Sequence, residues 1–501
     1  MRRIRSQHAP RGAEEGTRIL ARQAVSTRRV LRSVAVVVLA LLFVCPAARG
    51  DVGVVLNDST GRGIARITGS GHSGVYFSRV CPASPIELRL CSPGEDGAVI
   101  STYSSFGQDY DFEWNIVPLS VYLYGVEKFQ DRPLFASEKI KSLLEENYRK
   151  TALASVCSLP PCAASGKGQW RAMVGATLNR SVYVFVVATT VEQDLDFIAK
   201  FNTRPNQSHF NGIIRNCADF TRDIINAYFP KSTRRNYLND FGMTSPKGIA
   251  RSLARYAGSH PDFPYHVLHF PQLPGTTKRS TAPRAGTEQL FRSKKLAIPM
   301  MAVAVHATVA SAVTYLLTGR FNPHRELEHY PIARARELEA QKKLAQSRKD
   351  FALARRLSAE QKQERADILG SSEDWRNYRE TFAGVLDEAL RNGLIPSRKA
   401  LAGVFKYLDQ RGTPVLGPDG ALWMEIHENG RVSRVGLNAK SIYSPESDPR
   451  LTYQVLLARI DDALKSPPRR RPAIATFTED WALREQVQAA IEMPNSSAGL
   501  R

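Results

Sequence analysis

The sequence predicts an α+β protein, followed by an apolar membrane-spanning segment and a mostly helical C-terminal region with a β-hairpin. Three observations support this fold class. Residues 51–105 show the short apolar or alternating runs, separated by Pro and Gly, that are typical of strands. Amphipathic helical patterns come next, at residues 137–149 and 216–228. An uncharged stretch covers residues 296–317, and the turn signals of a hairpin lie at 416–435.

Composition limits the class of protein and of partner. The chain has 501 residues, 43% of them hydrophobic and 23% charged, which is enough for two or three folded domains. Its formal net charge of +21 suits an anionic membrane surface, an acidic polymer or nucleic acid. The sequence contains no zinc knuckle, basic zipper or interleaved aromatic–basic repeat, so we expect a membrane rather than nucleic acid as the partner.

Residues 1–50 have the features of an export signal with a long basic leader. A basic flank ending at Arg32 precedes an apolar run over residues 33–44. Ala48 and Gly50 place small residues at positions −3 and −1 of a cleavage before Asp51. An uncleaved anchor helix is the alternative, and both interpretations export the residues after Asp51.

Four cysteines form two close pairs in the sequence. Cys81 and Cys91 flank a short apolar stretch, and Cys157 and Cys162 flank a Pro-Pro turn. An oxidising compartment would permit both local disulfides. This simplest pairing leaves Cys217 as a free thiol, which is either reactive or buried and inert.

The exported domain is expected to extend over residues 51–270. Strands are predicted at residues 72–77, 86–90 and 98–103, and a strand buried on both faces at 181–190. The clearest helix start is at Asn216, a good N-cap, with Asp219 in the first turn.

Cys217 is the strongest candidate for chemistry. A thiol in the first turn of a helix lies beside unsatisfied backbone N–H groups, which favour the thiolate and can bind an oxyanion. Asp219 opposes a second anion unless its carboxylate turns outward to cap the helix. A thiolate nucleophile also needs an imidazole as base, and the candidates are His72, His209, and the pair His266 and His269. No spacing indicates a zinc site, and no metal or cofactor is expected.

The motif around Cys217 resembles that of a known superfamily. Phe210-Asn211, a four-residue gap, then Asn216-Cys217 and Phe220 is similar to the Tyr-Asn, Asn-Cys and Phe signature of the circularly permuted papain-like proteins. These include the NlpC-type hydrolases and the relatives of lecithin:retinol acyltransferase. His72-Ser73-Gly74-Val75-Tyr76 resembles their histidine strand, which precedes the cysteine helix in permuted members. The resemblance covers residues 65–230.

The resemblance implies a small antiparallel sheet packed on the cysteine helix. It also implies cleavage or transfer at amide or ester bonds through an acyl-thioenzyme, with Cys217 as nucleophile and His72 as base. The helix start at Asn216 and Ala218 would supply the cap and the oxyanion site. Ser101 stands where relatives often have a third polar residue, usually histidine, and Glu95 is an alternative for that role. Cell-wall peptides and lipid acyl esters are the expected substrates.

The remaining chain is predicted to cross a membrane. A basic Pro/Gly linker at residues 271–295 precedes the transmembrane helix at 296–317, which places the C-terminal residues in the cytoplasm. Residues 318–370 have the pattern of a long charged helix. Residues 371–501 are predicted to be helical, with the hairpin, a basic tail and a possible cytoplasmic protein partner.

Two functions therefore remain open from the sequence. The first is a membrane-anchored thiol hydrolase or acyltransferase that acts outside the cytoplasm. The second is a non-enzymatic envelope binding or structural protein with Cys217 buried. A third arrangement keeps the enzyme but uses His266 or His269 as the base.

Overall fold

The fold is described from a computed structural model. It describes residues 50–60, 69–103, 113–155, 168–207, 210–260 apart from 213 and 238, 263–327 apart from 264 and 293, and 382–465, with a few single positions between 342 and 380. Several predictions lie outside these residues: the export signal, the Cys157–Cys162 pair, His209, most of the charged helix at 318–370, and the basic tail.

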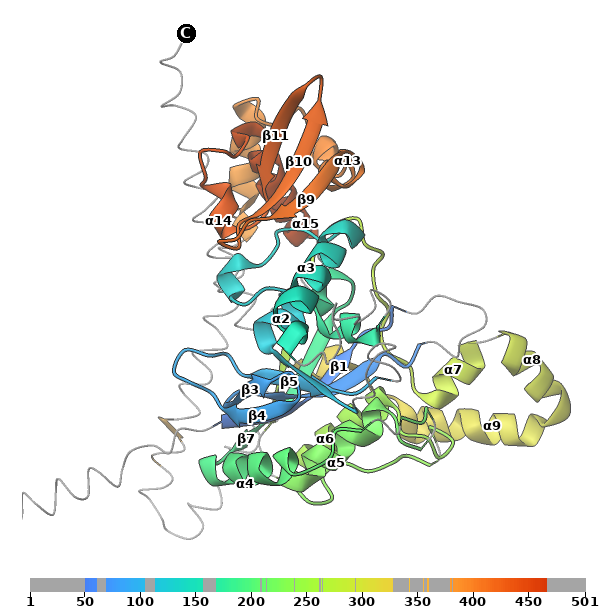
Figure 1. Ribbon diagram of the computed structural model, residues 1–501. Coiled ribbons are helices and arrows are strands. Elements are labelled where there is room, and N and C mark those ends of the chain that lie inside the picture. The colour runs from blue at the N-terminus through green and yellow to red at the C-terminus, as the bar shows by residue number, and fades with distance from the viewer. Residues whose placement is uncertain are drawn as a thin grey trace, which may run out of the picture. The chain divides into compact units, whose positions relative to one another are not determined.

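A six-stranded sheet forms the centre of the first region, and every adjacent pair of its strands is antiparallel (Figure 1). In spatial order the strands are β6 (Asn115–Pro118), β5 (Ala98–Ser101), β2 (His72–Phe77), β1 (Gly50–Asn57), β7 (Val182–Thr189) and β8 (Tyr265–Phe270). The strands predicted near residues 72, 98 and 181 are present. The α+β class is therefore correct for this region.

Helices cover both faces of this sheet. One layer consists of α4 (Val191–Asn202), α5 (Cys217–Tyr228) and α6 (Pro246–Ser259), and the other begins with α2 (Leu119–Tyr124) and α3 (Glu138–Thr151) (Figure 1). Because side chains alternate along a strand, Val75 and Phe77 pack in the core under α5, whereas Tyr76 packs in the core beside α2. Short 3-10 turns complete the α2 layer: η1 (Phe129–Asp131), η2 (Leu153–Ser155), η3 (Gln169–Met173) and η4 (Ala176–Leu178).

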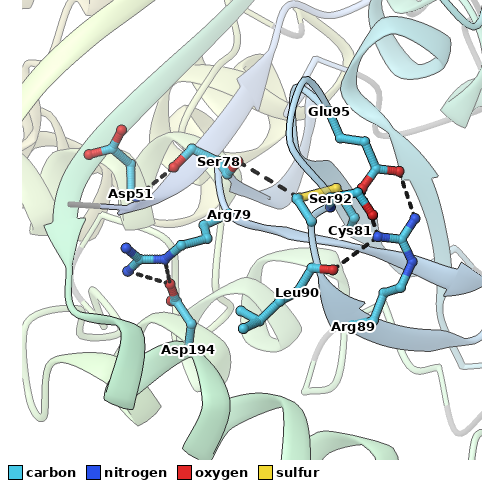
Figure 2. Close-up of a disulfide and its surroundings, with 10 residues drawn as sticks. Asp51, Ser78, Arg79, Cys81, Arg89, Leu90, Ser92, Glu95 and Asp194 are labelled. Atoms are coloured by element: carbon cyan, nitrogen blue, oxygen red, sulfur yellow. Dashed lines mark hydrogen bonds and ion pairs between the residues drawn. A yellow bond between two sulfur atoms is a disulfide. The ribbon is translucent and has the colours of Figure 1, made fainter. Parts of the chain in front are cut away.

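A two-stranded ribbon, β3 (Val80–Ser84) and β4 (Glu87–Leu90), carries the predicted Cys81–Cys91 disulfide (Figure 2). The Cα atoms of the two cysteines are 4.9 Å apart. Beside it the guanidinium of Arg89 binds both carboxylate oxygens of Glu95, at 2.7 and 2.6 Å (Figure 2). This ion pair lowers the pKa of Glu95 to about 2, so the carboxylate is charged at any ordinary pH.

The predicted transmembrane helix is wrong. The uncharged stretch is divided between α8 (Lys294–Val303) and α9 (Val305–Thr314), with a break at Ala304, and ends in the π-helical turn η5 (Tyr315–Gly319). Each of these ten-residue helices is roughly 15 Å long, about half the thickness of a bilayer's hydrocarbon core. In the described part of the chain no helix has both the length and the apolar character needed to cross a membrane.

The C-terminal unit, residues 382–465, is mostly helical and contains a small antiparallel sheet, as the sequence predicts. The predicted hairpin is present as β10 (Leu422–Glu428) and β11 (Arg431–Gly436), joined at Asn429 and Gly430, which both have positive φ as a type I′ turn requires. A third strand, β9 (Gly412–Leu416), completes the sheet. Its helices include residues 382–391, α12 (Arg398–Leu401), α13 (Val404–Arg411), α14 (Ala439–Ile442) and α15 (Pro449–Lys465). The helix α7 (Gly286–Arg292) belongs to the earlier region.

The C-terminal unit contacts the first region directly. The backbone N–H of Leu134 donates to the carbonyl oxygen of Leu437 at 2.8 Å, and the rings of Phe135 and Phe405 stack with their centroids 4.9 Å apart. A membrane between the two regions would prevent these contacts. The predicted topology, with one region outside the membrane and the other in the cytoplasm, is therefore wrong as well.

Candidate active site

The start of α5 is built as the sequence predicts. The Oδ1 atom of Asn216 accepts hydrogen bonds from the backbone N–H of Ala218 at 2.8 Å and of Asp219 at 3.1 Å. In return the Asp219 carboxylate accepts the N–H of Asn216, which completes a capping box. The N–H of Ala218 binds the cap oxygen and also lies at the Cys217 sulfur, so its role as an oxyanion donor stays a prediction.

Asp219 is turned away from the thiol and is neutralised by cations. Its Oδ1 atom accepts hydrogen bonds from Arg222 at 2.9 Å, from Arg235 at 2.7 Å and from the hydroxyl of Thr244 at 2.5 Å. The carboxylate therefore caps the helix and binds arginine, which is the outward arrangement that weakens its opposition to a thiolate.

Cys217 is a free, half-buried cysteine beside the first residues of β2. Burial raises the pKa of its thiol above the ordinary value. Hydrogen bonds from the backbone N–H and hydroxyl of Ser73, and from N–H groups at the start of α5, act in the opposite direction. The thiol is therefore protonated near neutral pH, although donors for a sulfur or oxygen anion surround it.

His72 and Ser101 are brought together, as the resemblance implies. The Nε2 atom of His72 lies 2.6 Å from the Oγ atom of Ser101, and the imidazole stacks on Tyr103 with ring centroids 3.9 Å apart. Ser101 donates its only hydroxyl proton to the carbonyl oxygen of Ser73 at 2.7 Å. The Nε2 atom of His72 must therefore carry the proton that the Ser101 oxygen accepts, which leaves Nδ1 with a free lone pair.

The structure does not join His72 to Cys217. Ser73 faces α5, where Thr221 lies 3.2 Å from its hydroxyl, and His72 projects to the opposite side of the strand. Among the described residues, neither a hydrogen bond between the thiol and the imidazole nor any hydrogen bond to Nδ1 of His72 is formed. Burial and the nearby Arg180 guanidinium hold the pKa of His72 well below its usual value, so the imidazole is neutral.

Sequence reasoning missed the polar residues that surround this histidine. Tyr103 follows Ser101 by two positions, so strand alternation could have placed it beside the imidazole. Tyr122 accepts a hydrogen bond from the Nδ2 atom of Asn57 at 2.6 Å, and Asn57 is the register partner of His72 on β1. Arg180 precedes β7 and is buried, as are Tyr103, Tyr122 and Asn57. No local signal in the sequence indicates that this arginine is buried.

The other candidates lie elsewhere. His266 and His269 are on β8, at the opposite end of the sheet from β5 and β6, and α5 packs over β2 and β1 instead. His269 stacks on Tyr183, and burial lowers its pKa to about 3. Glu95 is occupied by Arg89 at the surface. Neither the third arrangement nor the Glu95 alternative has a geometric basis.

Metal binding has little support in the described residues. Cys81, Cys91 and Glu95 form the one group of potential ligands that lie close together there, and the disulfide removes both thiolates as ligands.

Comparisons with known proteins give no relative: no family model matches the chain, and no curated protein or solved structure is similar to it.

Proposed function

We propose that the protein is a thiol-dependent acyl-transfer enzyme that cleaves amide or ester bonds through an acyl group on Cys217. One observation carries the proposal: a half-buried thiol at a capped helix start lies next to Ser73, and the adjacent residue His72 is held by Ser101 as a neutral imidazole with Nδ1 open. This is the tautomer that a general base requires.

The reaction can be written with all atoms accounted for. The sulfur attacks the carbonyl carbon, the thiol proton passes to Nδ1 of His72, and the carbonyl oxygen becomes an oxyanion. The imidazolium returns the proton to the leaving amine or alcohol as its bond to carbon breaks. Water or an acceptor amine or alcohol then attacks the thioester, and His72 again takes and returns the proton.

The oxyanion needs donors that the cap does not use. The N–H of Cys217 is the first in α5, lies at the sulfur and is not used by the cap, so it is the best candidate. The hydroxyl of Ser73 is the second, because it already points at the sulfur. Since thiol and imidazole are not in contact, the thiol must move toward Nδ1 when the substrate enters.

The Cys81–Cys91 disulfide supports an oxidising compartment as the place of action. This agrees with the export signal expected at residues 1–50.

A non-enzymatic binding protein is the second candidate, and one observation favours it. Burial raises the pKa of the Cys217 thiol and lowers that of the His72 imidazole, which is the pattern of a packed cysteine beside a packed histidine. In that case the polar groups around β2 would serve stability alone.

The test is acylation by an activated ester. We expect a short-chain p-nitrophenyl ester to release a burst of p-nitrophenol and to leave one acyl group on Cys217, located by mass spectrometry. The rate should fall about a hundredfold or more in His72→Ala, because a general base contributes that much. Ser101→Ala should also slow it, because the tautomer is no longer held. Acylation of wild type should persist below pH ~6.5, the ordinary histidine value, since the pKa of His72 is lowered.

His266→Ala is the matched control, because this histidine lies on β8, away from α5, and its loss should leave the rate unchanged. If the acyl adduct forms at the same rate in His72→Ala, or forms only after unfolding, the enzyme proposal is wrong and the non-enzymatic binding protein is the better description.

A further inference from the structure

The outer side of α5 borders an open surface cavity of about 610 Å³. Four cations stand in its wall, together with one amide and one phenol: Arg222, Lys231, Arg234, Arg235, Asn226 and Tyr237. None of the described residues that line it is acidic. Tyr237 is 69% exposed, so the cavity opens to solvent beside an aromatic ring.

This cavity is separate from the thiol site. An α-helix turns about 100° per residue, so Arg222 and Asn226 project about 140° and 180° away from Cys217 around α5. Cys217 shares the inner side of the helix with Thr221 and Ile224, which are buried against the sheet. A ligand in the cavity would therefore lie behind the helix that carries the thiol.

The charges of the cavity are only partly neutralised. Arg222 and Arg235 bind Asp219, and Arg222 also binds Asp223 at 2.7 Å. Lys231 and Arg234 are exposed, and no carboxylate in the described residues pairs with either. The four cations against these two carboxylates leave a net charge of +2.

The turn that carries the two unpaired cations is held in place. The side-chain amide of Asn226 donates to the carbonyl oxygen of Thr233 at 2.9 Å and accepts its backbone N–H at 3.0 Å. Lys231 has a φ of 65°, in the left-handed region that non-glycine residues rarely occupy. Because the backbone of this turn is already fixed, only the exposed side chains of Lys231 and Arg234 have to be ordered when a ligand binds.

We propose that this cavity binds the phosphate group of a phosphate ester. Guanidinium groups match the oxygens of phosphate with forked hydrogen bonds, and a net +2 matches the charge of a phosphate monoester better than that of a single carboxylate. The monoester can be soluble or can be the headgroup of a lipid such as phosphatidic acid, because both present the same phosphate group. The site goes beyond the acyl-transfer proposal and does not depend on it.

The experiment uses the full-length chain. Binding of inorganic phosphate and of glycerol 3-phosphate is measured by calorimetry at fixed ionic strength, with acetate as the carboxylate arm. Flotation with phosphatidylcholine vesicles, with and without phosphatidic acid, tests the lipid source, because only phosphatidic acid presents a phosphate monoester. We expect the double variant Lys231→Ala/Arg234→Ala to weaken phosphate binding roughly tenfold or more, because two charge-assisted contacts are lost. Neither side chain forms an ion pair among the described residues, so the fold should be retained.

A control double variant, Lys128→Ala/Lys278→Ala, removes the same charge from two exposed lysines outside the cavity and should bind phosphate as wild type does. Vesicle binding that only the cavity variant weakens would identify a lipid headgroup as the source. Three results would overturn the proposal. They are an equal loss of phosphate affinity in both double variants, tighter binding of acetate than of phosphate, and no binding of either inorganic phosphate or glycerol 3-phosphate. Cys217→Ser should bind phosphate normally, so failure of the acyl-transfer proposal would leave this site standing.

Discussion

Ser73 and His72 are adjacent on β2, and their opposite directions decide what the Cys217 thiol meets. Ser73 points to α5 and offers the sulfur a hydroxyl and an N–H, while His72 points to Ser101 and Tyr103. The resting site therefore contains a neutral thiol and a neutral imidazole rather than an ion pair. The acyl-transfer proposal therefore requires a change that brings Nδ1 and the sulfur together.

The pH dependence of alkylation tests this resting state. Because burial raises the thiol pKa, labelling of Cys217 by iodoacetamide should reach half its maximal rate above the ordinary thiol value of about pH 8.5. Ser73→Ala removes a donor that favours the thiolate and should move the midpoint higher. His72→Ala should leave it unchanged. Labelling is followed by mass spectrometry of the Cys217 peptide. A midpoint below about pH 8 in wild type would contradict a resting thiol whose pKa is raised by burial.

At the scale of elements, the start of α5 links the thiol to the rest of the fold. The Asn216 side chain caps the helix and also donates from Nδ2 to the carbonyl oxygen of Thr244 at 3.0 Å, just before α6. Asp219 continues this connection through Arg235 and the Thr244 hydroxyl. One polar network therefore sets where Cys217 lies relative to β2 and organises two of the cations of the phosphate cavity.

Asn216→Ala tests the importance of this cap. We expect the free energy of unfolding to fall by about 1–2 kcal/mol, because the N-cap bonds and the contact with Thr244 are lost together. Chemical denaturation gives the value, and the labelling rate of Cys217 should change with it. Asn147→Ala, at an exposed position within α3, is the matched control and should change stability little. If Asn216→Ala and Asn147→Ala change stability equally, the cap at Asn216 does not contribute the stability that we assign to it.

On the scale of the whole molecule, the C-terminal unit shares a core with the first region. Phe135 is fully buried, with Phe405 stacked on it, and the amide of Asn438 donates to the carbonyl oxygen of Asp131 at 3.0 Å. Lys440 adds an ion pair to the Asp131 carboxylate at 2.9 Å. These contacts involve η1 and the segment between it and α3, and Lys139 of α3 donates to the carbonyl oxygen of Gly412 at 2.9 Å. The C-terminal unit therefore stabilises the layer that covers the His72 side of the sheet.

Phe405→Ala should therefore destabilise both regions together. Because Phe405 is only half-buried, we expect a loss of about 1–2 kcal/mol rather than the roughly 3–5 kcal/mol of a fully buried phenylalanine. Hydrogen exchange should rise in α3 as well as in the C-terminal unit. Val432→Ala, which truncates an exposed side chain of β11, is the control. An increase confined to the C-terminal unit would show that the two regions fold independently.

Local chemistry in the sequence was sufficient for the parts of this protein that depend on neighbours along the chain. The N-cap at Asn216, the Asn429-Gly430 turn of the hairpin, the strand that begins at His72 and the Cys81–Cys91 disulfide all arise from residues a few positions apart. Turn, cap and strand preferences are short-range effects, so one sequence suffices to predict them.

Only the tertiary structure decided the rest. The resemblance placed His72 beside Cys217, but in the folded chain the imidazole binds Ser101, and Ser73 is the residue of β2 that contacts the thiol. The length of the uncharged apolar run predicted a membrane span at residues 296–317, and the break at Ala304 divides this run into two short helices. Arg180 and the shared core around Phe135 join segments far apart in the sequence. Contacts of this kind are selected by complementary shape and burial in three dimensions, which hydrophobic period and spacing do not encode.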